Sequence, residues 1–457
     1  MKITKIIENI FKKYIPSPFT IAVLLTFLTL ILALLFTKPE TTNTVAYFFD
    51  VLGFWEKGLW SNNLLVFAYQ MMLILVLGHV LVLSKPMSNL IAKLTQYCTN
   101  TANSAFIVSA ATMLVSFFNW GLGLIFGALL ARRVAEDAQQ KDLDLNYPLI
   151  GAAGYVGLMV WHGGISGSAP IKINEEGHLR SMVSPENLHL TKIPEVISYN
   201  QTVFSWWNLL LFFVVMLSVA SVFYFIGKKV KPTTFNLEIY QLETEDEVNT
   251  KAEKLDNSKL LGIVFGVIIL IAFGFRYFSD IKSLKITPNL INLFMLGLAI
   301  ILHGNFKQFI KAIGVAISDV SGILIQFPLY FGIMGIMNST GMVTLVSDFF
   351  VSISTETTLP IFTFFSAGLV NIFVPSGGGQ WIVQGPIVLQ SALELGVPLP
   401  KAIMALAYGD QITNMLQPFW ALPLLGITKL KAKEILPYTL IAMLVGSVIY
   451  ILGLIIL

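Results

Sequence analysis

Residues 119–123 read Asn-Trp-Gly-Leu-Gly, and residues 375–381 read Pro-Ser-Gly-Gly-Gly-Gln-Trp. Each run lies between two apolar stretches that are short for a membrane crossing. A longer apolar segment follows each run, and polar residues interrupt it in turn at 162–170 and at 410–418. Interrupted apolar segments at corresponding places in two halves indicate the binding site of a secondary transporter. The repeated pattern therefore predicts a membrane carrier.

The composition excludes several classes of protein. The 457-residue chain is 55% apolar and 12% charged, whereas soluble proteins carry about 25% charged residues. This deficit excludes an ordinary soluble protein and indicates a surface that faces a lipid bilayer. The net charge of +3 is too small to indicate a nucleic-acid partner. The single cysteine, Cys98, excludes an intramolecular disulfide and a cysteine-rich metal site.

The predicted fold class is an all-α polytopic membrane protein with about nine transmembrane helices and two re-entrant hairpins. A span needs about 20 apolar residues, and runs near that length fall at 18–36, 63–84, 146–162, 203–227, 259–279, 289–304, 318–337, 402–420 and 436–457. The apolar regions 103–135 and 358–393 surround the glycine-rich runs and are predicted as the hairpins. The first span resembles a signal peptide, but no small-residue cleavage site follows it, so we expect it to be retained.

The distribution of positive charge predicts the orientation. With a cytoplasmic N-terminus, more than two-thirds of the 29 Lys and Arg residues lie in the inner segments, as the positive-inside rule requires. The two hairpins then enter from opposite sides, which makes the halves inverted-topology repeats.

The predicted organisation follows from this orientation. Its regions are an N-terminal helix and outer loop (1–62), a first repeat (63–227) with hairpin 103–135 and broken helix 146–170, a cytoplasmic linker (228–258), scaffold helices (259–317), and a second repeat (318–457) with hairpin 358–393 and broken helix 402–427. The linker is rich in polar residues, and we expect it to be solvated.

The breaks predict a substrate site. Non-helical backbone at membrane depth persists only where protein, water or a ligand satisfies it, and glycines let the backbone approach a ligand closely. A helix that begins near Gln380 would direct its positive end at the tip, which suits an anion. A flexible loop between two ordinary spans is the alternative. The candidate substrate-binding residues are Asn119, Gly121, Gly123, Ser166, Ser168, Ser376, Gly377, Gly378, Gly379, Gln380, Thr413 and Asn414.

Asp410 is the predicted centre of ion coupling. A charged Asp inside a membrane helix costs roughly 2.5–3.5 kcal/mol, so such residues are functional by default. Asp410 could bind Na⁺ together with Thr413 and Asn414, carry H⁺, or pair with His162; Gln411 and Gln417 complete the candidate coupling residues. Close helix packing by small residues is the alternative for this break. No organic cofactor is expected, and the lack of Lys or Arg in the predicted core favours a small monoanion as substrate.

Four motifs carry a family resemblance, at 119–127, 162–170, 375–381 and 408–411. With these motifs the chain resembles the short-chain fatty acid transporter family of the AtoE type. The resemblance implies uptake of monocarboxylates such as butyrate or acetoacetate across a bacterial inner membrane. It also implies, through a wider ion-transporter group, elevator-like motion and a homodimer. A related branch that carries amino acids or other carboxylates has Pro-Ser-Gly-Ser-Gly-Gln at the second tip, and Gly378 and Trp381 here favour the fatty-acid type.

Two other functional classes remain open from the sequence. A channel would conduct without saturation or coupling to a gradient. An intramembrane serine protease would use Ser166 within the run Gly164-Ile165-Ser166-Gly167, but it would need a base within hydrogen-bond reach of that serine. The interruptions in the second half have no role in a protease, so we expect that the chain is not an enzyme.

Overall fold

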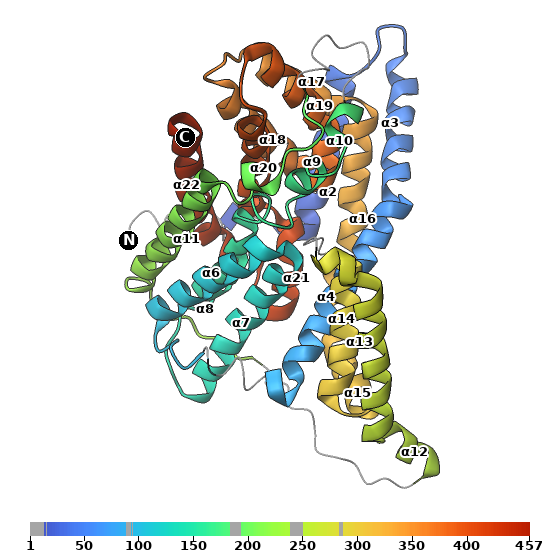
Figure 1. Ribbon diagram of the computed structural model, residues 1–457, viewed down its shortest axis with the longest axis vertical. Coiled ribbons are helices and arrows are strands. Elements are labelled where there is room, and N and C mark those ends of the chain that lie inside the picture. Colours follow the sequence, from blue (N-terminus) through green and yellow to red (C-terminus); the bar gives the residue numbers. More distant parts are fainter. Residues whose placement is uncertain are drawn as a thin grey trace.

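The computed structural model describes residues 13–14, 16–87, 93, 95–182, 193–237, 250–282 and 287–457. All regular secondary structure within these ranges is helical (Figure 1). This confirms the all-α fold class.

Seven helices of the described residues are long and apolar enough to cross a membrane. They are α2 (Pro18–Phe36), α4 (Asn62–Leu83), α6 (Thr101–Phe118), α11 (Trp206–Gly227), α13 (Lys259–Lys282), α16 (Ser321–Ser339) and α22 (Ala432–Ile456). The chain is thus a multi-pass membrane protein. Six of the seven coincide with predicted spans, whereas α6 was predicted as a hairpin arm. Its 18 residues extend about 27 Å at 1.5 Å per residue, so the count of nine crossings stays a prediction.

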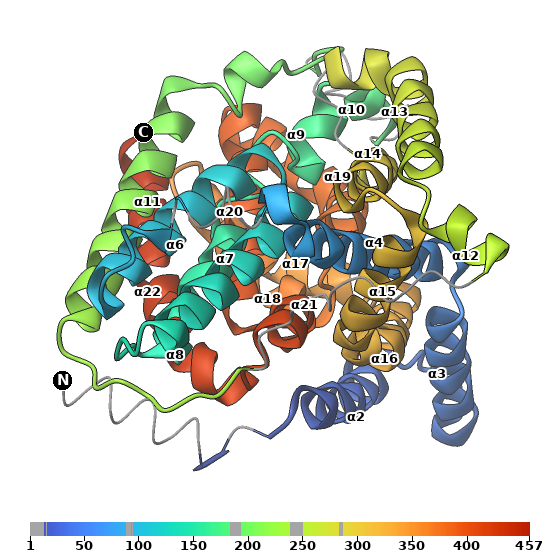
Figure 2. The same cartoon turned by 90° about the horizontal axis from the view of Figure 1, so that it is seen from below.

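Shorter helices connect and flank these seven. They include α3 (Thr44–Leu59), α10 (His178–Ser181), α12 (Lys251–Asp256), α14 (Pro288–His303), α15 (Phe306–Ala316), α17 (Met342–Ser352) and the 3₁₀ turns η3 (Tyr199–Gln201) and η4 (Ile317–Val320). In both views α3, α13, α14, α15 and α16 lie together on one side of the molecule, and α11 and α22 lie on the other (Figures 1 and 2).

Each glycine-rich run lies at the tip of a helical hairpin. In the first, α6 and α7 (Trp120–Gln140) pack together and are separated by Asn119 alone. In the second, α18 (Leu359–Phe373) and α19 (Gly377–Leu395) are separated by residues 374–376. Asn119 and Ser376 are the N-caps, and their side chains accept the N–H groups of Leu122 and Gly379. These caps satisfy backbone donors that a helix start leaves without partners.

The glycines themselves are helical, which corrects the expectation that they form the break. Gly121 and Gly123 lie in the first turn of α7, and α19 begins at Gly377 rather than near Gln380. Their role is close packing: a Cβ on Gly123 would lie 1.9 Å from Ser116 Oγ on the opposite arm. The side-chain caps, rather than glycine, determine where each helix begins.

A broken helix follows each hairpin. The first comprises α8 (Tyr147–Tyr155), the 3₁₀ turn η1 (Val156–Met159), irregular backbone at 160–167 and α9 (Ser168–Ile173). The second comprises α20 (Leu399–Thr413), the 3₁₀ turn η5 (Asn414–Leu416), extended Gln417 and α21 (Pro418–Thr428). In each, a 3₁₀ turn precedes the break, so the same order of elements occurs twice.

The two hairpins lie at opposite ends of the molecule. In Figure 1, α6, α7 and α8 occupy the lower half, and α18, α19 and α20 occupy the upper half. Helix α20 packs along α18, and α21 packs along α7. The broken helices therefore connect the two hairpins near the middle of the molecule, which is where the candidate residues lie.

Part of the predicted linker is docked rather than solvated. The Gln139 side chain on α7 forms hydrogen bonds with both the N–H and the carbonyl of Leu237. Phe235 packs on Tyr147 with ring centroids 5.1 Å apart. Residues 238–249 of the linker lie outside the described residues.

Candidate functional site

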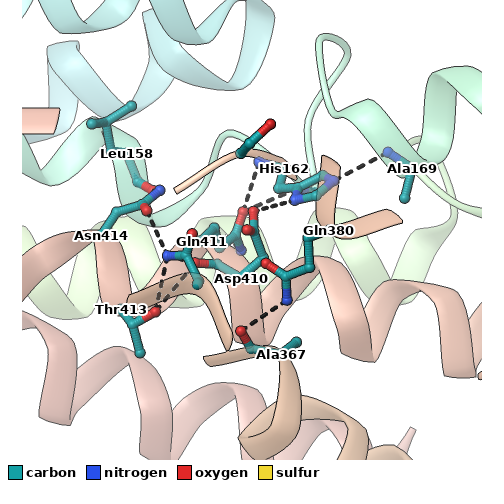
Figure 3. A network of polar contacts seen from close by, with 12 residues as sticks. Leu158, His162, Ala169, Ala367, Gln380, Asp410, Gln411, Thr413 and Asn414 are labelled. Carbon is teal, nitrogen blue, oxygen red and sulfur yellow. Dashed lines mark hydrogen bonds and ion pairs between the residues drawn. The ribbon is translucent and has the colours of Figure 1, made fainter. Parts of the chain in front are cut away.

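The two breaks meet at a buried His–Asp pair (Figure 3). His162 Nδ1, from the first break, lies 2.5 Å from Asp410 Oδ2 on α20. Both residues are almost inaccessible, with 0% and 1% of their surfaces exposed. The structure thus brings together two predicted coupling residues that are 248 positions apart in the chain.

The second ring nitrogen of His162 fixes its tautomer. Nε2 lies 3.1 Å from the Ala169 nitrogen and accepts that backbone N–H. Because an accepting nitrogen carries no proton, the proton of a neutral imidazole lies on Nδ1 and is donated to Asp410. A neutral histidine therefore faces one carboxylate group.

Gln411 holds the irregular backbone beside this pair. Its Oε1 accepts the N–H groups of His162 at 2.8 Å and Gly163 at 3.0 Å. These donors lie in the break, where no helical carbonyl is available to them. The side chain from α20 thus replaces helical hydrogen bonds in the first broken helix.

Side chains also satisfy the carbonyl groups that the breaks release. The Asn208 amide donates to Gly163 O, the Tyr450 hydroxyl to Met159 O, and the Tyr155 hydroxyl to Asn414 O. Buried carbonyl groups without partners cost several kcal/mol in hydrocarbon. Hydrogen bonds within the protein therefore stabilise the irregular backbone of both breaks.

Asn371, which the sequence analysis missed, organises the second break. From α18, its side-chain nitrogen lies within 3.0 Å of Asp410 O, Thr413 Oγ1 and Asn414 Oδ1. The Gln417 amide donates to the Asn371 carbonyl. The oxygens of Thr413 and Asn414 that were expected to bind Na⁺ are thus hydrogen-bonded within the protein. A single amide two residues before the end of an apolar helix was the available signal.

The hairpin tips contact the first break. The Trp120 N–H donates to Ser166 Oγ at 2.9 Å, and the Ile165 N–H to Phe117 O at 2.8 Å. At the second tip, a Cβ on Gly377 would lie 2.8 Å from the His162 ring, and one on Gly378 would lie 3.8 Å from Ser168 Oγ. Of the twelve predicted substrate-binding residues, Ser166, Ser168, Gly377 and Gly378 therefore lie within or against residues 162–168.

Several buried polar atoms around the pair have no hydrogen-bond partner in the protein. The acceptors are Asp410 Oδ1, Gln380 Oε1 and Gln417 Oε1, and the donors are Gln411 Nε2 and Trp161 Nε1. The Gln380 nitrogen is engaged by Ala367 O on the opposite arm of the second hairpin. Buried polar groups are normally paired, so this concentration of unpaired atoms indicates a place for a ligand.

Aromatic side chains form one wall of the site. Trp161 stacks on His162 with ring centroids 4.5 Å apart. Trp120 lies 5.9 Å from Trp161 and 5.2 Å from Trp420, and Phe67 packs against both Trp120 and Trp420. An apolar group of a ligand could pack against these aromatic rings.

The charge at the site is a single carboxylate. Among the described residues, the buried Asp, Glu, Lys and Arg side chains are Asp410, Arg132 and Glu136. Arg132 and Glu136 pair with each other on α7, and Arg132 also donates to Ile427 O at the end of α21. The described residues contain no cluster of three or more His, Cys, Asp or Glu side chains that could hold a metal ion.

The geometry gives Ser166 no catalytic base. Its Oγ accepts the Trp120 N–H, and both ring nitrogens of His162 are engaged, by Asp410 and by Ala169. A nucleophilic serine needs a base that can take its proton. The protease interpretation therefore has no support at this site.

Comparison with known proteins identifies the family of the chain. The family model described as "Short chain fatty acid transporter" matches residues 1–457. The chain belongs to the short-chain fatty acid transporter family. A protein of Escherichia coli K12, provisionally named a short-chain fatty acid transporter, is 34% identical over 99% of both chains. A protein of Haemophilus influenzae Rd with the same provisional name is 32% identical, again over 99% of both. The family is one of transporters, which confirms the predicted class of membrane carrier.

Two solved transporter structures are more distant. The YdaH transporter of Alcanivorax borkumensis is 16% identical, with a TM-score of 0.42 over 96% of this chain and 98% of that one. MtrF of Neisseria gonorrhoeae, described as one of a class of antimetabolite efflux pumps, is 14% identical, with a TM-score of 0.41 over 97% and 96%. TM-scores at this level do not establish a shared fold.

Proposed function

We propose that this chain moves short-chain fatty acids or similar small monocarboxylates, such as butyrate or acetoacetate, by cation-coupled secondary active transport. The observation that carries the proposal is the buried Asp410, whose Oδ1 has no protein partner, at the junction of two broken helices. An intramembrane carboxylate is retained where it binds an ion or a substrate. Membership of the family supports the class of substrate.

The surrounding groups suit a small monoanion. Gln411 Nε2 and Trp161 Nε1 are buried donors without partners, and the first N–H groups of α19 add the positive end of a helix. The wall formed by Trp120, Trp161 and Trp420 suits a short alkyl chain. A dicarboxylate would bring a second negative charge to a site that has no buried Lys or Arg among its described residues.

The transport cycle we propose uses the two hairpins as gates. The hairpins and broken helices move together as an elevator-like unit against the helices around α3, α13 and α16, and two copies of the chain assemble as a homodimer. The chain lies in the bacterial inner membrane with its N-terminus in the cytoplasm, and the halves are inverted repeats. The recurring order of hairpin, helix, 3₁₀ turn and break supports this cycle.

Counterflow tests the proposed function without any gradient. Purified full-length protein is reconstituted in liposomes loaded with unlabelled acetoacetate, and labelled acetoacetate is added outside at the same pH 8. We expect saturable exchange that butyrate inhibits and that protein-free liposomes lack. Exchange of amino acids but not of acetoacetate would assign the chain to the related branch, and a linear, non-saturable flux would assign it to the channels.

A further inference from the structure

We infer that the coupling ion is a single proton, bound at Asp410 Oδ1, and that His162 positions this carboxyl group. The inference rests on the proposed function, because it names the ion that accompanies the acid. Three observations carry it: the tautomer of His162, the unpartnered oxygen of Asp410, and the engagement of the nearby oxygens that a metal ion would need.

The hydrogen bonds leave one atom on which an added proton can lie. Ala169 N–H occupies His162 Nε2, and the Nδ1 proton is donated to Asp410 Oδ2. A second proton on the imidazole would require Nε2 to lose the bond that it accepts. Asp410 Oδ1 is buried and has no hydrogen-bond partner in the protein. It is therefore the basic atom of the pair that can accept a proton without breaking an existing hydrogen bond.

The charge balance explains why a proton is needed. A monocarboxylate that approaches the site meets the negative charge of Asp410, and in a buried environment such repulsion is strong. A proton on Oδ1 removes that charge and provides an O–H donor for the incoming carboxylate. One proton and one monoanion then cross together without net charge, and on the other side the acid and the proton are both released.

The site has fewer free oxygen ligands than a sodium ion would need. Na⁺ as a hard cation requires several oxygen ligands. Thr413 Oγ1 and Asn414 Oδ1, the expected ligands beside Asp410, both accept hydrogen bonds from Asn371. A proton requires only the one free oxygen that Asp410 supplies.

Few other titratable groups face the pair. Helix α20, which carries Asp410, contacts α9, α18, α19, α22, η1 and η5. Along these elements and α20, the described titratable residues other than the pair are Lys172, Glu394, Lys401, Tyr408, Lys433, Glu434, Tyr438 and Tyr450. The charged ones lie within a turn of a helix end, and the Tyr408 hydroxyl donates to Asn208 Oδ1. Asp410 is therefore the group at this site whose protonation can accompany transport.

The test separates coupling from transport itself. Proteoliposomes with equal Na⁺ on both sides, a clamped potential and an alkaline interior are given labelled acetoacetate, and protein-free liposomes correct for diffusion of the free acid. The wild-type chain is expected to accumulate acetoacetate about tenfold per pH unit, as one proton per acid requires. Asp410→Asn is expected to retain counterflow but lose this accumulation. The exposed Asp348→Asn is the matched control and is expected to behave as wild type.

Current measurement makes the inference falsifiable even where the Asp410 variant is inactive. A jump in acetoacetate concentration is expected to produce no sustained current from wild-type protein, because the proton cancels the charge. His162→Ala is expected to change the shape of the pH profile of counterflow, since the N–H bond to the Asp410 carboxyl group is lost; a purely structural role would lower the rate at all pH values alike. Three results would each overturn the inference: accumulation driven by Na⁺ at equal pH, a sustained wild-type current, or pH-driven accumulation by Asp410→Asn. Absence of counterflow in the wild type would instead overturn the proposed function.

Discussion

The first hairpin and its broken helix share an order of elements with the second, but the two units differ in polar chemistry. In the first, the hairpin residues Thr112 and Ser116 are buried and have no side-chain hydrogen-bond partner. In the second, Asn371 connects the hairpin to Asp410, Thr413 and Asn414. The first unit contributes the irregular backbone and His162, and the second contributes the carboxylate and the amides that hold both.

This difference shows that the backbone frame and the polar side chains have separate roles, although the repeated sequence pattern contains both. The backbone frame, with one capped tip and one 3₁₀ turn before the break, occurs in each unit. The side chains that satisfy the frame do not repeat, because each break has its own orphan donors and acceptors. The His162–Asp410 pair takes one residue from each unit, so its formation depends on how the two units meet.

Replacing Asn371 should break the second unit and have the largest effect. Asn371→Ala removes the amide that three acceptors share, two of them fully buried. Each buried group left unsatisfied costs about 1–3 kcal/mol, so we expect a marked drop in the apparent melting temperature in detergent and loss of acetoacetate counterflow.

Ser116→Ala is the matched change in the first unit. Ser116 lies two residues before the end of α6, as Asn371 lies two before the end of α18. Because Ser116 Oγ has no partner, we expect its removal to change stability by less than about 1 kcal/mol. Equal losses in the two variants would show that the units are satisfied alike and would contradict the comparison.

The second tip offers a contrast between adjacent glycines, with an intermediate effect. A Cβ at Gly377 would lie 2.7 Å from Trp161 Cη2 and 2.8 Å from His162 Cε1, whereas at Gly378 the nearest atom is 3.8 Å away. Because the two rings are stacked and buried, they cannot yield without cost, and overpacking costs about 1–3 kcal/mol. We expect counterflow to fall about tenfold in Gly377→Ala and to change less than about twofold in Gly378→Ala.

The measurement is the initial rate of counterflow, normalised to folded protein by size-exclusion chromatography. Similar rates in the two glycine variants would mean that the tip does not lie against His162 in the transporting protein. Such a result would contradict the contact between the second hairpin tip and the first break.

The hairpins and broken helices could be predicted because the interruptions of the apolar segments can be read directly from the sequence. The sequence-based prediction misplaced the start of the second hairpin helix near Gln380, whereas Ser376 caps the helix and Gly377 begins it. It identified His162 and Asp410 as corresponding residues, but their bond depends on how two distant breaks meet. Asn371 was missed because one amide in an apolar helix has no periodic pattern, and its three acceptors are assembled only by packing.

The orientation of the two hairpins can be tested with the smallest perturbation. Burial raises the pKa of the Cys98 thiol to about 11, an increase that a hydrogen bond with Ser104 partly offsets. At pH 7.5 fewer than about one thiol in a thousand is then ionised, so wild-type protein should react very slowly with maleimide, and faster as the pH rises toward 11.

The native cysteine can therefore stay in place while two exposed positions at the hairpin bases are labelled. Asp144→Cys lies between α7 and α8, and Glu356→Cys lies just before α18. We expect both variants to transport as wild type, and we expect a membrane-impermeant maleimide to label them from opposite faces of oriented membrane vesicles. Labelling from the same face would contradict inverted repeats, and the shared order of elements would then be a repeat in sequence without inversion in the membrane. Opposite labelling would mean that His162 and Asp410 meet because two units that enter from opposite faces each stop at the middle of the membrane.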